Sequence, residues 1–298
     1  MTAHRKYALI MHGARAGSPE LRHLVSWVRA KGHHISPHVT WEAGDATRFA
    51  RRAAGRGVDA VIAAGGDGTI NEVLNGIAGF DVPLGIIPVG TANDFARQAG
   101  IPPDVDHAMD VILRRPPVRV DTLTMNGRRF LNVSSGGVGA EATAETRADA
   151  KESLGMLAYA ITGARKLREL MPRQGTVRGP GFDFEGEFLL FAVGNARVTG
   201  GGIAITPRAS VTDGLLDFCL VEALPRAEFA RLALRIRNGE HLDHPAVRYA
   251  QLSEVTVEGA EPISVNVDGE PCGDRVLEYR VRKGDLLLHV VRLPGEQI

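Results

Sequence analysis

Apolar runs of strand length alternate with segments of helical periodicity through the first third of the chain. The helix-like segments lie between and after the strand-like runs, and short connections join them all. This alternation predicts an α/β domain with a doubly wound parallel sheet over residues 1–120. At the start of the first helix, Ser18 is the expected N-cap and Pro19 the first helical residue. The strand-like runs are residues 6–12, 34–40, 59–66 and 83–90, and the helix-like segments are 18–33, 43–57, 69–79 and 93–100.

The pattern changes near Val118, where segments that alternate apolar and polar residues begin, with turn signals between them. One such signal is the Asn126-Gly127 pair, which predicts a β-hairpin. Helical patterns interrupt the strands at residues 148–170 and 226–237. We therefore predict a second domain over residues 121–298, a mainly antiparallel β-sandwich.

Composition narrows the class of protein. The 298 residues include 35 lysines and arginines and 35 aspartates and glutamates, and this balance argues against a nucleic-acid partner. The only cysteines are Cys219 and Cys272, so reduced thiols in the cytoplasm are expected. No apolar run approaches the ~20 residues of a transmembrane span. The sequence thus predicts a cytoplasmic protein without a transmembrane segment, and it leaves the oligomeric state open.

A specialised turn follows the third strand-like run, at Gly65, Gly66, Asp67, Gly68 and Thr69. Ligands of open parallel sheets bind beyond the carboxyl ends of the strands, where this turn falls. Its glycines let a ligand approach the backbone, and we expect Thr69 to cap a helix whose N-terminus attracts an anion. Without a Walker lysine, phosphates would be held by amides, the helix dipole and a metal ion. The Asp67 carboxylate would repel phosphates unless a cation or a ribose hydroxyl intervenes.

A second glycine-rich turn follows the next strand-like run, with Gly90, Thr91, Asn93 and Asp94. Two such turns on adjacent strand ends would form two walls of one nucleotide cleft. The alternative is a pair of strained turns that only connect strands to helices. The number of small and polar residues at both strand ends favours the nucleotide cleft.

These blocks resemble a known family. "GGDGTINEV" followed by "LGIIPVGTANDFAR" is similar to the diacylglycerol kinase catalytic domain, and specifically to bacterial lipid kinases of the YegS-like type. Further blocks resemble the family in its order, so the resemblance covers nearly the whole chain. It implies an NAD kinase-like α/β domain, a β-sandwich domain, an active site between them, and transfer of the γ-phosphate of ATP to a lipid hydroxyl. The further blocks are "VTWEAGDA", "NVSSGGVGAEAT", "GNARVTGGG", "PRASVTDGLLDF" and "VNVDGEP".

The resemblance also implies roles for individual residues. It makes Glu270 the acceptor of the proton from the lipid hydroxyl, with Asp268 as a supporting or metal-facing carboxylate. A positioned carboxylate suits this task, although an ordinary Asp-Gly hairpin explains the local sequence equally well. The expected nucleotide contacts are Thr40, Gly65, Gly66, Asp67, Gly68, Thr69, Ile70, Asn71, Glu72 and Thr91.

Another acidic turn carries Asp213. In the family this turn holds a structural divalent cation, and the resemblance implies the Asp213 carboxylate and the main-chain carbonyls of Ser210 and Leu215 as ligands. Oxygen ligands suit magnesium or calcium. The alternative is an ordinary turn with a solvated aspartate. The expected small molecules are thus ATP as substrate, Mg²⁺ as cofactor, and Mg²⁺ or Ca²⁺ at the structural site.

Two other functions stay open on the residues alone. An NAD kinase shares the glycine turn, and a non-catalytic nucleotide or lipid sensor would keep the cleft without turnover. The expected acceptor is a glycerolipid of the diacylglycerol or phosphatidylglycerol type, reached peripherally at the inner face of the membrane. Apolar residues with basic neighbours in 148–170, and Phe229, Leu232 and Ile236, suit a membrane surface or the packing of a helix on the sandwich.

Overall fold

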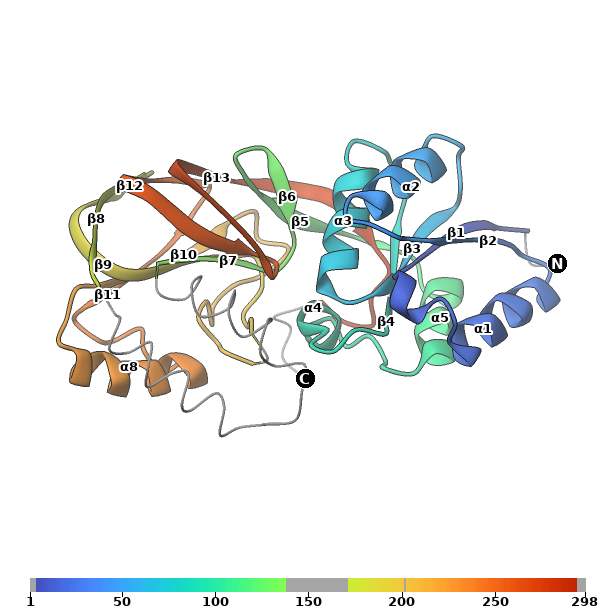
Figure 1. The fold of residues 1–298 in the computed structure, drawn as a ribbon, viewed down its shortest axis with the longest axis horizontal. Coiled ribbons are helices and arrows are strands. Elements are labelled where there is room, and N and C mark those ends of the chain that lie inside the picture. Colours follow the sequence, from blue (N-terminus) through green and yellow to red (C-terminus); the bar gives the residue numbers. More distant parts are fainter. Residues whose placement is uncertain (1–3, 138–170, 201, 294–298) are drawn as a thin grey trace. The chain divides into compact units, whose positions relative to one another are not determined.

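The computed structural model describes residues 4–137, 171–200 and 202–293. These divide into two compact units (Figure 1). Unit 1 comprises the described residues within Met1–Thr122 and Lys283–Ile298, and unit 2 comprises those within Leu123–Arg282. The sequence predicts one domain over 121–298, whereas the described residues 283–293 belong to unit 1. The helix expected at 148–170 lies outside the described residues.

Unit 1 is built on a parallel sheet with the strand order β4-β3-β1-β2. The carboxyl ends of the strands are in register, since Met11 pairs with both Val39 and Ala64, and Gly65 pairs with Pro88. β1, β3 and β4 are almost continuously buried, which is typical of parallel strands covered on both faces. The strands are β1 (Lys6–Met11), β2 (His34–Val39), β3 (Ala60–Gly65) and β4 (Leu84–Pro88).

Helices cover both faces of this sheet. α2 packs against α3, α1 packs against α5, and Figure 1 shows the two pairs on opposite sides of the strands. The doubly wound α/β prediction is therefore confirmed. Ser18 caps α1, because its hydroxyl accepts the N–H of Leu21 at 3.2 Å. The elements are η1 (Gly13–Arg15), α1 (Pro19–Ala30), α2 (Asp45–Ala54), α3 (Asp67–Ile77), α4 (Asp94–Gln98) and α5 (Val105–Arg114).

Unit 2 is the expected antiparallel sandwich. Its strands follow the order β11-β10-β9-β7-β12-β13, and β8 pairs with both β9 and β12. A core rich in phenylalanine, including Phe188, Phe191 and Phe218, fills its interior. Two strands, β5 (Val118–Met125) and β13 (Glu270–Leu288), belong partly to unit 2 and partly to unit 1. The strands wholly within unit 2 are β6 (Arg128–Phe130), β7 (Val133–Gly137), β8 (Arg173–Gly179), β9 (Phe182–Gly194), β10 (Leu216–Glu222), β11 (Val247–Leu252) and β12 (Glu254–Val267).

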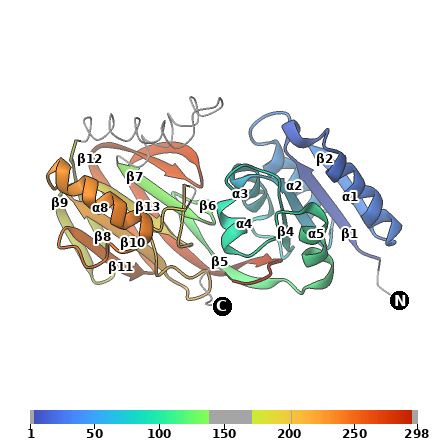
Figure 2. The same cartoon turned by 90° about the horizontal axis from the view of Figure 1, so that it is seen from below.

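The second predicted helix of this half is α8 (Arg226–Asn238), which Figure 2 shows in front of the strands. Its apolar residues Phe229, Leu232 and Ile236 are buried in a cluster with residues of β9 and β10. The stripe that the sequence offered for a membrane surface therefore packs on the sandwich, which was the alternative. Among the described residues, no helix has both the length and the apolar character needed to cross a membrane.

Candidate functional site

The first glycine turn joins β3 to α3. Helix α3 begins at Asp67 with Gly66 at its N-cap, and no side chain caps it. The expectation that Thr69 caps this helix is wrong, because Thr69 lies inside the first turn and is buried. A Cβ on Gly65 would lie 2.4 Å from Thr69 Oγ1, so only glycine lets the threonine fold back onto the strand end. The first amides of α3 have no partner within the helix and, with the helix dipole, favour an anion.

The two glycine turns meet backbone to backbone. A Cβ on Gly90 would lie 2.3 Å from the Cα of Gly66, and a Cβ on Gly66 would lie 3.3 Å from the Cα of Gly90. This approach follows from the pairing of Gly65 with Pro88 at the ends of β3 and β4. The structure therefore brings together the two turns that the sequence placed on adjacent strand ends.

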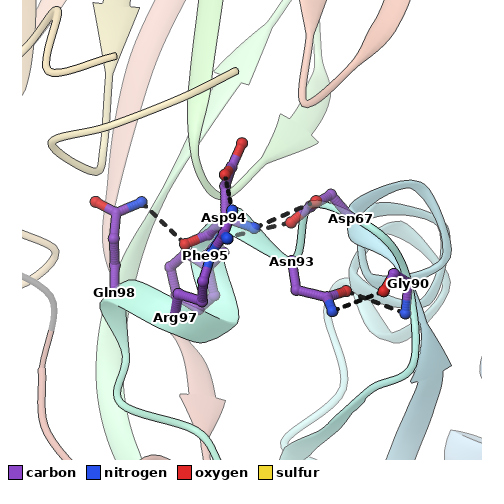
Figure 3. A network of polar contacts seen from close by, with 7 residues as sticks. All are labelled: Asp67, Gly90, Asn93, Asp94, Phe95, Arg97 and Gln98. Carbon is purple, nitrogen blue, oxygen red and sulfur yellow. Dashed lines mark hydrogen bonds and ion pairs between the residues drawn. The ribbon is translucent and has the colours of Figure 1, made fainter. Parts of the chain in front are cut away.

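Asn93 holds the second turn in shape. Asn93 adopts the left-handed backbone conformation, with φ of 49°, which asparagine tolerates better than most residues. Its Oδ1 accepts the N–H of Gly90 at 3.1 Å, and its Nδ2 donates to the carbonyl oxygen of Gly90 at 3.0 Å (Figure 3). Its Nδ2 also donates to the carbonyl oxygen of Pro88 at 3.2 Å. Thr91 lies exposed at the tip of this turn. One side chain thus fixes the backbone that faces the first turn.

Two carboxylates lie where the turns meet. The Asp67 oxygens are 3.4 and 3.5 Å from the amide nitrogens of Asp94 and Phe95, which are long hydrogen bonds (Figure 3). The Asp94 carboxylate accepts a 2.9 Å hydrogen bond from Arg97. Burial raises the pKa of Asp67, and the nearby Asp94 charge raises it further. A weakly held carboxylate beside a like charge is a suitable ligand for a cation.

Thr40 lies at the end of β2, on the same edge of the sheet as Gly66. Its N–H donates to the Met11 carbonyl at 3.0 Å, and its hydroxyl accepts the N–H of Gly13 at 3.3 Å. A Cβ on Gly13 would lie 2.4 Å from the Thr40 carbonyl oxygen, so the start of η1 lies tightly against Thr40. Thr40 is therefore fixed at the edge where the sequence analysis expected it.

The remaining residues expected to contact the nucleotide have other contacts. Ile70 and Asn71 are buried within unit 1. Glu72 reaches α2, where its Oε2 accepts the N–H groups of Gly44 and Ala46 at 3.1 and 3.0 Å. These side chains thus contribute to the packing of unit 1, and their contact with a nucleotide stays a prediction.

In unit 2, the expected β-turn between β12 and β13 is present, with positive φ at both Asp268 and Gly269. The Asp268 carboxylate is buried and accepts three backbone N–H groups. They come from Leu131 at 2.8 Å, Asn132 at 3.0 Å and Val133 at 3.2 Å. Asp268 thus joins this turn to the segment between β6 and β7.

Glu270 begins β13 directly after that turn, and its carboxylate is partly exposed. Its Oε2 accepts a 2.6 Å charge-assisted hydrogen bond from the Arg128 guanidinium, which is at the start of β6. The arginine fixes the position of the carboxylate. Asp268 therefore anchors the turn that precedes Glu270, and Arg128 holds the Glu270 carboxylate.

Asp213 forms an Asx turn, in which its Oδ1 accepts the N–H of Leu215 at 3.0 Å. The hydroxyl of Ser210 is 3.3 Å from that of Thr212, the residue before Asp213. In the described residues no group of three or more His, Cys, Asp or Glu side chains could hold a metal ion. A cation bound at this turn would therefore depend on main-chain oxygens as well as on the single carboxylate.

Three residues in special environments, Asp217, Asp45 and Arg128, are not among those that the sequence predicts for the site. Burial raises the pKa of Asp217 to about 6, against hydrogen bonds from Tyr249 and Gln251. Asp45 accepts two backbone N–H groups, and Arg128 pairs with Glu270. The position of Asp45 at the start of a helix-like segment was an available signal. The partners of Asp217 and Arg128 are distant in sequence, so nothing local marked them.

Two family models together match most of the chain. The diacylglycerol kinase catalytic domain matches residues 6–125, and the YegS C-terminal NAD kinase beta sandwich-like domain matches residues 133–290. A curated relative from Pseudomonas aeruginosa (strain UCBPP-PA14), described as a probable lipid kinase YegS-like, is 39% identical over 287 residues, covering 96% of this chain and 94% of the relative. The chain belongs to the YegS-like lipid kinase family. A relative of the same description from Stenotrophomonas maltophilia (strain K279a) is 37% identical, with 96% of both chains covered.

Solved structures agree with this membership. A putative diacylglycerol kinase from Bacillus anthracis strain Sterne matches with a TM-score of 0.79 at 26% identity, over 97% of this chain and 98% of the other. A further structure from the same strain, also described as a putative diacylglycerol kinase, gives a TM-score of 0.78 over the same shares. The YegS-like lipid kinase family therefore accounts for both units, the glycine turns and the sandwich.

Proposed function

We propose that the protein transfers the γ-phosphate of ATP to a hydroxyl group of a glycerolipid. The observation that carries this proposal is the uncapped N-terminus of α3, which lies against the second glycine turn at a Gly66–Gly90 contact too tight for a side chain. Membership of the YegS-like lipid kinase family supports the lipid as acceptor.

The phosphates of ATP would bind to the first amides of α3, at Asp67, Gly68 and Thr69. These amides have no partner within the helix, and no side-chain cap competes for them. The glycines leave room for phosphate oxygens to approach the backbone. Thr40 and Thr91 would contribute at the neighbouring strand ends, one beside η1 and one on the second turn.

Mg²⁺ fits the Asp67 carboxylate, whose oxygens make only long hydrogen bonds and lie near the charge of Asp94. Asp67 would hold the ion beside the phosphates. The positive charge of the ion would then offset the repulsion between the Asp67 carboxylate and the phosphates. When bound, Mg²⁺ neutralises charge that develops on the phosphate oxygens. Asp94 would remain paired with Arg97 and keep the second turn in place.

Glu270 would accept the proton of the lipid hydroxyl as that oxygen attacks the γ-phosphorus. The carboxylate is partly exposed and held by Arg128, so it is accessible and fixed in position. Asp268 would position it through the amides of Leu131, Asn132 and Val133 and would not itself touch a metal ion. General-base assistance of this kind contributes about 10²–10⁴-fold to rates.

We keep the divalent site at Ser210, Asp213 and Leu215 as part of the proposal. The Asx turn alone accounts for an aspartate here, so this site rests on the family resemblance. Calcium or magnesium would bind the Asp213 carboxylate and the carbonyl oxygens of the other two residues. Metal analysis of the purified protein beside Asp213→Asn tests it, and equal metal content in both would remove the site.

We also propose that the enzyme works in the cytoplasm and meets its acceptor at the surface of the membrane. A glycerolipid in a bilayer presents its hydroxyl at the interface between headgroups and water, so a peripheral approach suffices. Flotation with vesicles of phosphatidylglycerol and phosphatidylethanolamine tests the approach. Protein that stays at the bottom of the gradient at every lipid composition would contradict it.

Incubation with γ-labelled ATP, magnesium and mixed micelles of single lipids tests the activity. Diacylglycerol and phosphatidylglycerol are separate arms, and NAD without lipid is a further arm. We expect labelled lipid in at least one lipid arm and no labelled dinucleotide. Labelled NADP would favour an NAD kinase, and ATP binding without any transfer would favour a nucleotide sensor.

A further inference from the structure

Trp41 is the most exposed large apolar side chain of the described residues, with 91% of its surface accessible. It follows Thr40 directly at the carboxyl end of β2. An indole in water forgoes a large burial free energy, since aromatic side chains carry the largest apolar surfaces. Its exposure next to a residue expected to contact the nucleotide calls for a partner.

The backbone that presents Trp41 is held firmly. Oδ2 of Asp45 accepts the N–H groups of Trp41 at 2.8 Å and of Glu42 at 3.3 Å. Asp45 is only 4% exposed, and its Oδ1 accepts a 2.6 Å hydrogen bond from Arg48. The hydrogen bond from the Trp41 N–H lowers the pKa of Asp45 most. The hydrogen bond from the Glu42 N–H and the charge of Arg48 lower it further. These hydrogen bonds therefore fix the backbone from which the Trp41 side chain extends.

The same loop is tied to the helix of the first glycine turn. Glu72 of α3 accepts the N–H groups of Gly44 and Ala46, and its carbonyl accepts the hydroxyl of Thr47 at 2.9 Å. α2 and α3 pack closely, and a Cβ on Gly76 would lie 2.5 Å from the Thr47 carbonyl oxygen. The position of Trp41 is thus coupled to the position of the phosphate-binding amides.

The sheet sets the spacing between Trp41 and those amides. β1 lies between β2 and β3, and Met11 pairs with both Val39 and Ala64. With neighbouring strands about 4.8 Å apart, the ends of β2 and β3 are separated by about 10 Å. A nucleotide with its phosphates on α3 can span that separation along the sheet edge with its ribose and base.

We propose that Trp41 is the stacking platform for the adenine base of ATP, and this rests on the proposed function. Nucleic-acid bases stack on aromatic side chains, and this stacking raises binding affinity for any base because every base has a flat π-face. Asp45 and Glu72 act as positioning residues that place the indole along the edge from the phosphates. A membrane contact would also use an exposed tryptophan, but it would not need the link through Glu72 to α3.

Fluorescence of a single-tryptophan protein tests this directly, because the chain has only two tryptophans. The other, Trp27, is on α1, where the Lys31 ammonium lies 4.5 Å from its ring centroid, and Trp27→Phe removes it. ATP titrated into Trp27→Phe should change the Trp41 emission with a midpoint equal to the calorimetric Kd. Vesicles of phosphatidylglycerol without ATP form a second titration, and a blue shift there without an ATP response would overturn the proposal.

Affinities of Trp41→Ala and Trp41→Phe complete the test. We expect Trp41→Ala to weaken ATP about tenfold and to leave inorganic tripolyphosphate, which has no base, unchanged. Trp41→Phe should restore most of the ATP affinity. Equal ATP affinity in the parent and Trp41→Ala, or equal losses for ATP and tripolyphosphate, would overturn the role of Trp41 while the kinase activity stood. A parent that binds no ATP would overturn both.

Discussion

Gly66 and Gly90 approach so closely that a Cβ on Gly90 would lie 2.3 Å from the Gly66 Cα. Gly66 directly follows β3 and Gly90 lies two residues beyond the end of β4, and their contact lies at the proposed phosphate site. No side-chain rotamer relieves such a clash, because the backbone fixes the position of the Cβ on residue 90 as well as that of the Gly66 Cα. The contact therefore ties the fold to the proposed phosphate site.

Gly90→Ala should push the two turns apart. We expect a loss of about 1–3 kcal/mol in the free energy of unfolding, together with weaker ATP binding. Urea unfolding and calorimetry with ATP measure the two effects. Gly17→Ala is the matched control, since a Cβ there meets nothing within 4 Å and should leave both quantities unchanged. Unchanged ATP affinity in Gly90→Ala would contradict the placement of the phosphates.

Asp67→Asn should separate stability from function. Burial raises the pKa of Asp67 above its usual 3.8, so its contribution to stability is present at low pH and is lost as the pH rises through the folded-state value. Neutral asparagine should therefore raise the melting temperature of the ligand-free protein at pH 7 and lower its magnesium-dependent ATP affinity. Thermal melts with and without Mg²⁺ and ATP check both signs. A variant that is less stable without ligand would argue against an uncompensated carboxylate.

Asp268 should behave as a positioning residue. Asp268→Ala leaves three buried N–H groups, those of Leu131, Asn132 and Val133, without their acceptor and should cost about 3 kcal/mol or more in unfolding free energy. Asp268→Asn keeps an acceptor oxygen and suits the positive φ, so it should lose less. Urea midpoints rank the three proteins. A kcat loss in Asp268→Asn at unchanged stability would instead assign Asp268 a direct chemical role.

Asp217 should make stability depend on pH. Its pKa of about 6, raised from 3.8 by burial, means that its contribution is present below about 4 and is lost as the pH rises through about 6. Against Asp217→Asn, the parent should therefore lose about 3 kcal/mol between pH 4 and neutral pH. Melting both proteins side by side in chelator isolates this group. A difference that does not vary with pH would contradict the buried environment of Asp217.

The sequence predicted those parts of the candidate site that depend on the local pattern of apolar, glycine and polar residues. Apolar runs that end in glycine turns placed Gly66 and Gly90 at neighbouring strand ends, because parallel strands end on one edge. The Asp268-Gly269 turn was also readable, since this dipeptide favours positive φ. Each of these features depends on residues close together in the chain.

Contacts between distant segments were not readable from sequence. The hydrogen bonds of the Glu72 carboxylate with Gly44 and Ala46 of the α2 N-terminus left no local signal, and the contact of Glu72 with the nucleotide stays a prediction. The three amides on Asp268 come from more than 130 positions earlier, and the return of the chain after Lys283 to unit 1 left no local signal. Only packing decides which distant polar groups a buried carboxylate meets.

Lipid phosphorylation by Glu270→Gln beside the parent tests whether Glu270 takes the proton of the lipid hydroxyl. Glutamine keeps the size of the side chain and an oxygen that can accept the Arg128 hydrogen bond, but it cannot take up the proton. We expect kcat for transfer from γ-labelled ATP to lipid to fall by about 10²–10⁴-fold, while the Kd for ATP and the melting temperature stay the same. Full lipid kinase activity in Glu270→Gln would contradict this role of Glu270.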